Sequence, residues 1–215
     1  RQHMVHTHIS LWAQLKRLLY NPQHLLALSL TGAMMLAGFS IIPYISPYFV
    51  DNLGFGEDTL GYFYMAGGAA TFFSARWIGG LADQYGKPRV YRCVALASII
   101  PILGLTHLPA VPIVVAIAMM AIFMVLVSGR MVPAVAMITS SASPAVRGSF
   151  MSLNAAVQQT FSGVAALVGS AFLSKGVSGT LVGFGHIGWF ATGFTLVCVA
   201  LSFWIKPAKS EGFKG

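Results

Sequence analysis

Charge is the scarcest property of this chain of 215 residues. Only 8% of the residues are Asp, Glu, Lys or Arg, whereas 56% are hydrophobic. Water-soluble domains carry roughly a quarter charged residues. So few charges cannot cover a surface that faces water on all sides. The composition therefore excludes an ordinary soluble domain and predicts an all-α protein of the lipid bilayer.

Acidic residues are rarer still, with five in the whole chain, and three of them are Asp51, Glu57 and Asp58. This leaves no carboxylate pair for acid–base chemistry and no nucleophile–base set, so we expect no enzymatic activity. The net charge of +8 could indicate a nucleic-acid partner. However, the cations separate apolar runs and form no single stripe, so we expect no nucleic acid.

Cysteine is nearly absent. Cys93 and Cys198 both lie inside apolar runs, where they are typical of small apolar residues and not of a disulfide or metal site. His3, His6 and His8 have no neighbouring carboxylate or thiol, so we expect neither a metal nor a cofactor. The polar and basic start shows no signal peptide and is typical of a linker within a longer protein.

Long apolar runs dominate the rest of the chain, and about 20 apolar residues suffice to cross a bilayer as a helix. The predicted helices are 25–50, 59–82, 89–107, 113–138, 145–173 and 184–205. They divide the chain into a linker with an interfacial amphipathic helix (1–23), a six-helix transmembrane domain (24–206) and a tail (207–215).

Basic residues occur in every second link between these predicted helices. The N-terminal segment, the links after the second and fourth helices, and the tail are basic, whereas the opposite links carry only Lys175. The positive-inside rule therefore places both termini in the cytoplasm.

Proline marks two positions in the predicted helices. Pro43 and Pro47 should kink the first helix, and the freed carbonyls need protein or water neighbours, so this half-helix should face the interior. Before the fifth helix, Ser143 is a predicted cap and Pro144 a predicted first-turn residue.

The link after the second predicted helix combines an acid, a turn glycine and several cations. Gly86 suits the turn, and Pro88 is well placed to open the next helix. The stretch resembles the signature loop of the major facilitator superfamily of transporters, G-x-L-A-D-R-x-G-R-K. The matching residues are Gly79, Leu81, Ala82, Asp83, Gly86 and Lys87, whereas Gln84 and Pro88 depart and Arg89 follows one step late. The alternative is a polar turn without a switching role.

The resemblance covers nearly the whole chain and is greatest to the second six-helix half of arabinose-type drug and sugar efflux permeases. It implies one half of a 12-helix bundle in the bacterial inner membrane, with the N-terminal half as its partner. It further implies proton-coupled efflux of small organic molecules by alternating access. The expected gating residues are Gly79, Asp83, Gly86, Lys87 and Arg89.

The same resemblance implies that the first and fourth helices line a central cavity, that the second and fifth form the seam, and that the third and sixth face lipid. The cavity candidates are Arg130, Asn154, Gln158, Phe39 and Tyr44. An intramembrane arginine usually faces a cavity or a partner, although Arg130 could instead bond backbone carbonyls. Asn154 and Gln158 share one helix face, where they contact substrate or join helices.

No acid lies in the middle of a predicted helix, so a proton-coupling acid would have to come from the other half. A self-standing six-helix channel or scaffold that dimerises through its second and fifth helices is the alternative.

The glycines at 183, 185 and 188 match a dinucleotide-binding pattern by letter only, since no strand is predicted before them. Their spacing instead predicts close helix packing.

Overall fold

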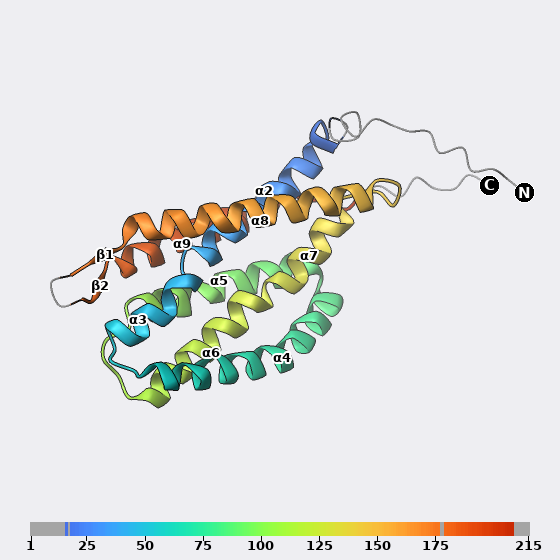
Figure 1. Ribbon diagram of the computed structural model, residues 1–215. Helices are drawn as coiled ribbons and strands as arrows, with labels where there is room; N and C mark the ends of the chain where they lie inside the picture. Colours follow the sequence, from blue (N-terminus) through green and yellow to red (C-terminus); the bar gives the residue numbers. More distant parts are fainter. Residues whose placement is uncertain (1–15, 17, 177–178, 209–215) are drawn as a thin grey trace, which may run out of the picture.

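The computed structural model describes residues 16, 18–176 and 179–208 and is mainly helical (Figure 1). Its α-helices are α2 (Pro22–Phe39), α3 (Ile45–Asp51), α4 (Leu60–Tyr85), α5 (Lys87–Thr106), α6 (Ile113–Gly129), α7 (Met131–Ser140), α8 (Arg147–Phe172) and α9 (Phe184–Leu201). Two short 3₁₀ helices, η1 (Ile42–Tyr44) and η2 (Glu57–Thr59), precede α3 and α4. The all-α class is confirmed. Most of the predicted linker, with His3, His6 and His8, and most of the tail lie outside the described residues.

Proline sets the ends of two helices. Pro43 has no N–H for the carbonyl of Phe39, the residue at which α2 ends. Pro133 likewise has none for Gly129, at which α6 ends. The chain continues as η1 and α3 in the first case and as α7 in the second. The first and fourth predicted helices are therefore each built from two segments.

Four segments of the described chain are long and apolar enough to cross a membrane: Pro22–Asp51, Lys87–Thr106, Ile113–Ser140 and Phe184–Leu201. Helices α4 and α8, with 26 residues each, have the length but are not among these four segments. These are the two helices for which the resemblance implies a seam. The membrane class is thus supported, and six crossings remain a prediction.

The packing pattern repeats between the two halves of the domain. Helix α2 packs against α8 and α9, and α6 packs against α4 and α5. Helices α5 and α9 contact each other, and α4 and α8 lie at opposite edges (Figure 1). The first three predicted helices therefore correspond in their packing to the last three, as in the internal repeats of many transporters.

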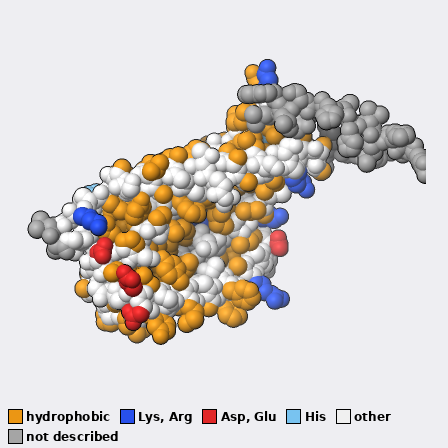
Figure 2. Space-filling view, viewed as in Figure 1, with side chains coloured by type: hydrophobic (Ala, Val, Ile, Leu, Met, Phe, Trp, Pro, Cys, Tyr) orange, Lys and Arg blue, Asp and Glu red, His pale blue; other side chains and the backbone are white. Residues whose placement is uncertain are grey.

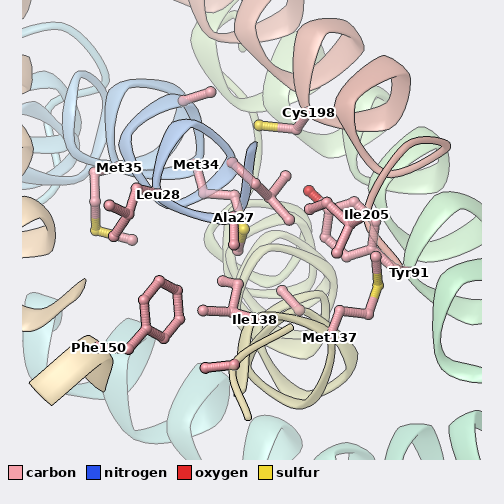
Figure 3. Close-up of a cluster of buried hydrophobic side chains, with 14 of the residues drawn as sticks. Ala27, Leu28, Met34, Met35, Tyr91, Met137, Ile138, Phe150, Cys198 and Ile205 are labelled. Carbon is pink, nitrogen blue, oxygen red and sulfur yellow. The ribbon is translucent and has the colours of Figure 1, made fainter. Parts of the chain in front are cut away.

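Apolar side chains fill both ends of the domain. One cluster draws Met34, Tyr91 and Phe150 together from α2, α5 and α8 (Figure 3). The other cluster includes Phe49 and Phe63, whose ring centroids lie 4.7 Å apart. Because lipid is as apolar as these side chains, their contribution comes from close packing more than from removal of water.

The glycines at the start of α9 serve the packing role that their spacing predicts. A Cβ atom at Gly188 would overlap the side chain of Thr106, and one at Gly185 would lie 2.7 Å from the His107 ring. Helix α9 can therefore approach the end of α5 only because these positions lack side chains. The expectation that no strand precedes these glycines is wrong, because strand β2 (Leu181–Val182) ends just before Gly183. Among the described residues, this strand pairs antiparallel with one two-residue strand only, which is not the parallel sheet of a dinucleotide-binding fold.

A small hairpin precedes α9 where the sequence predicts only a glycine-rich link. Strand β1 (Ser174–Lys175) pairs antiparallel with β2 (Leu181–Val182). Asn52, at the end of α3, extends this pairing. Its Nδ2 donates to the Leu181 carbonyl at 2.8 Å, and its Oδ1 accepts from the Leu181 N–H at 2.8 Å. One side chain thus fixes the end of the first span to the hairpin.

The prediction that Ser143 caps the fifth helix is wrong. Helix α8 begins at Arg147, its N-cap is Val146, and no side chain caps it. The Val146 N–H donates to the Ser143 carbonyl at 3.1 Å, so the backbone of Ser143 closes a turn before the helix. The Ser143 hydroxyl makes no hydrogen bond within the described residues.

Charged side chains lie mainly toward the ends of the molecule, with an apolar band between them (Figure 2). Acidic side chains gather at the end that carries the hairpin, and most Lys and Arg side chains lie toward the other. The band has the composition expected of a surface that faces lipid.

Candidate functional site

The link between α4 and α5 consists of Gly86 alone, which has a φ of +90°. A residue with a side chain adopts this conformation at a cost, so glycine is favoured here. Pro88 lies in the first turn of α5. The predicted turn is therefore present, and Lys87 and Arg89 both belong to the first turn of the following helix.

Asp83 lies in the last turn of α4 and is exposed. It forms no salt bridge with any described residue. Arg92, a cation of the following helix α5, lies over the Phe203 ring, 4.0 Å from the centroid. Nearby, Gly79 faces α7, and a Cβ there would make an ordinary contact 3.8 Å from Val132, so the packing of α4 on α7 does not require glycine at this position. The signature acid is thus available for a partner outside the described residues.

Arg130 lies at the junction of α6 and α7 and is only 1% exposed. Its Nη1 donates to Oγ1 of Thr195 on α9 at 3.0 Å. A Cβ at Gly38 of α2 would lie 3.9 Å from Nη2. Its Nε has no hydrogen-bond partner among the described residues. The guanidinium is therefore enclosed between three helices, and its bonded partner is a hydroxyl rather than a backbone carbonyl.

Two further candidates join the first span to α8. Asn154 is buried, and its Oδ1 accepts from the Thr31 hydroxyl at 2.6 Å. The Tyr44 hydroxyl donates to the Ala166 carbonyl at 2.6 Å. Both contacts join helices, which is the alternative that the sequence left open. Gln158 is half-buried and makes no side-chain hydrogen bond within the described residues.

Phe39 belongs to a face of the first span that no described helix covers. Its side chain is 36% exposed, and Leu25 and Ser29 are exposed on the same helix. On the fourth span, Ala118 and Val135 are exposed at positions opposite its buried residues. Sequence reasoning named no residue of this second face, because the fourth span is apolar all round and shows no periodic pattern to distinguish its sides.

In the described part of the chain, no group of three or more His, Cys, Asp or Glu residues is placed to hold a metal ion. Cys93 is exposed, Cys198 is buried, and both are free thiols.

The structure contains apolar helices that are long enough to cross a membrane. They form two corresponding sets, and each set contains one interrupted helix. This arrangement defines a helical integral membrane protein. The family model for the Major Facilitator Superfamily matches residues 27–215. The chain therefore belongs to that family of membrane transporters, which implies a small-molecule substrate. No curated protein and no solved structure matched the chain.

Proposed function

We propose that this chain is the C-terminal half of a proton-coupled exporter of small organic molecules, such as drugs or sugars. It works by alternating access in a bacterial inner membrane, with both termini in the cytoplasm. The observation that carries the proposal is the interruption of the first and fourth spans at Pro43 and Pro133, beside faces that no described helix covers.

An interrupted helix leaves backbone groups without their usual partners. At membrane depth these groups need protein or water, so interrupted helices line cavities more often than they face lipid. The uncovered faces that contain Phe39 and Ala118 lie on these two spans. Both features support a central cavity bounded by α2, α3, α6 and α7 on this side.

The edge helices α4 and α8 support a seam with another helical body. A Cβ added at Gly61 or Gly68 of α4, or at Gly163 of α8, would meet no atom within 4 Å. Glycines on an uncovered helix face permit close approach of a further helix. We assign these edges to the N-terminal half of the same transporter.

Asp83 supplies the closing contact in this proposal. It lies at the carboxyl end of α4, where the helix dipole is negative and does not favour a carboxylate. We propose that a positive group of the other half pairs with it when the cytoplasmic side is shut. This pair breaks and forms again in each cycle, so its free energy is modest.

Proton coupling requires an acid at mid-membrane depth, and none of the acidic residues in the described ranges lies there. Asp51, Glu57, Asp58 and Asp83 all lie near the ends of helices. The other half would therefore supply the coupling carboxylate. The proposal thus assigns cavity and gating to this chain and proton exchange to its partner.

Transport into inverted membrane vesicles tests the proposal. An imposed inside-acid proton gradient should drive accumulation of an exported compound in vesicles that contain the full-length protein, and a protonophore should abolish it. A panel of lipophilic cations and sugars supplies the candidate substrates. If no compound in such a panel accumulates in a gradient-dependent manner, the assignment as a proton-coupled exporter of this class is wrong.

A further inference from the structure

A pocket of about 390 Å³ lies outside the proposed cavity, at the end of the domain that carries most of the basic residues. It is formed by the start of α2, the turn before α8 and the segment after α9. Two hydrogen bonds hold this last segment in place. The Lys206 N–H donates to Gln23 Oε1 at 2.8 Å, and the Ala208 N–H donates to the Ser140 carbonyl at 2.8 Å.

The polar groups of the pocket are mainly donors. Lys206, Ser143, Asn21 and Gln23 line it; their side chains carry an ammonium group, a hydroxyl without a partner in the described chain, and two amides. The oxygens of both amides are already engaged, since Asn21 Oδ1 accepts from the Gln23 N–H at 2.9 Å. None of the described residues that line the pocket is acidic. Such a lining suits an anion.

The remaining wall combines apolar residues with His24 and Ser141, whose hydroxyl donates to the Ile138 carbonyl at 2.7 Å. His24 is buried, its Nδ1–H donates to the Leu18 carbonyl at 3.1 Å, and its ring centroid lies 4.8 Å from that of Phe150. These contacts fix the imidazole as part of the wall. The amino end of α2 also opens here, and its dipole is positive at that end.

Three apolar side chains beside the pocket bear on the kind of anion. Leu19, Tyr20 and Leu25 are all exposed, and Tyr20 is 77% exposed. Aromatic and aliphatic side chains near helix ends lie at the level of lipid headgroups and the first part of the acyl chains. The pocket volume suits a headgroup, and the flanking apolar residues suit the chains outside it.

We infer that this pocket binds the phosphate-bearing headgroup of an anionic phospholipid. Lys206 and Ser143 contact the phosphate, and the acyl chains lie along Leu19 and Leu25. Basic pockets between helices on the cytoplasmic side are suited to such headgroups. The inference rests on the proposed orientation of the chain in the membrane. Its test measures lipid binding and not transport, so the two proposals can fail separately.

Native mass spectrometry of the purified full-length protein, with phosphatidylglycerol or phosphatidylcholine added to the detergent, measures this binding directly. The wild-type protein should retain phosphatidylglycerol in preference to phosphatidylcholine. Lys206→Gln should lower that retention roughly fivefold, since a basic residue near anionic lipid contributes about 1 kcal/mol. Ser143→Ala removes a donor but no charge and should lower retention roughly threefold.

Lys16→Gln is the matched control, because Lys16 is an exposed cation in the same terminal region but does not line the pocket. It should leave retention within about twofold of the wild type, the change expected of a screened surface charge. Equal losses for Lys206→Gln and Lys16→Gln would overturn the inference, because they would show attraction to surface charge alone. Displacement of the lipid by millimolar glycerol 3-phosphate would overturn it as well, since a free phosphate ester would then be the ligand.

Discussion

The contact between Arg130 and Thr195 gives the sharpest test of how the buried arginine is held. Thr195→Val removes the acceptor at 3.0 Å from Nη1, in a region where Nε already has no partner among the described residues. A hydrogen bond to a charged group contributes roughly 1.5–3 kcal/mol. We therefore expect Thr195→Val to lower the free energy of unfolding by about 2 kcal/mol.

Arg130→Met should behave differently, because it removes the charge together with its need for partners. The desolvation penalty of a buried ion is several kcal/mol and opposes the gain from its single hydrogen bond. We expect Arg130→Met to change stability by less than about 1 kcal/mol, as apolar replacements of buried ions often do. In this background Thr195→Val should cost less than about 0.5 kcal/mol, because Thr195 retains only its bond to the Ala191 carbonyl.

Reversible unfolding in mixed SDS and detergent micelles measures all four proteins of this double-mutant cycle. The expected coupling energy is about 1.5–2 kcal/mol. If Thr195→Val costs the same in both backgrounds, the contact does not hold the arginine. Transport then separates structure from function. Arg130→Met should abolish transport, and Arg130→Lys should retain part of it, because lysine keeps the charge but not the forked donor geometry.

Three further predictions concern the two ends of the domain. Asn52→Ala should destabilise the hairpin by roughly 1–3 kcal/mol, because it removes both hydrogen bonds to Leu181. Hydrogen exchange of the Leu181 amide should become faster, and an unchanged rate would show that these two bonds do not stabilise the hairpin. A cysteine that replaces exposed Glu57 should react with an impermeant reagent added outside the cell, whereas one that replaces exposed Gln84 should not. Labelling of both cysteines from the same side would contradict six crossings. Asp83→Asn should slow transport with little loss of folded protein, and wild-type rates would leave Asp83 as a loop residue only.

Much of the helical layout could be predicted because its signals are local. Apolar runs identify helices in a membrane, Gly86 favours the turn that it forms, and the glycines before and within α9 favour close packing. Proline also predicts the interruption at Pro43, since α2 ends at the residue whose carbonyl the missing N–H would have bonded. It does not by itself predict the break at Pro133, because Pro101 lies inside α5 without ending that helix.

The candidate site was less predictable, because its contacts join residues far apart in the chain. Asn154 bonds Thr31, and Arg130 bonds Thr195, in both cases between helices whose pairing no local pattern specifies. The hydrogen bond from Asn52 to Leu181 of the hairpin could not be predicted for the same reason. At Ser143 the local pattern itself led to a wrong prediction. Ser143 and Pro144 resemble the start of a helix, but α8 begins about one turn later, at Arg147.

Accessibility of the two ends of the fourth span tests alternating access most directly. Ala118 lies on the uncovered face toward the hairpin end, and Thr139 is half-buried near the other end of α7. In the full-length protein, single cysteines at these positions should change their labelling rates in opposite directions when a proton gradient or substrate is added. Asp83→Asn should raise labelling at Thr139 and lower it at Ala118. Parallel changes at both positions, or none, would contradict a cavity that opens to each side in turn.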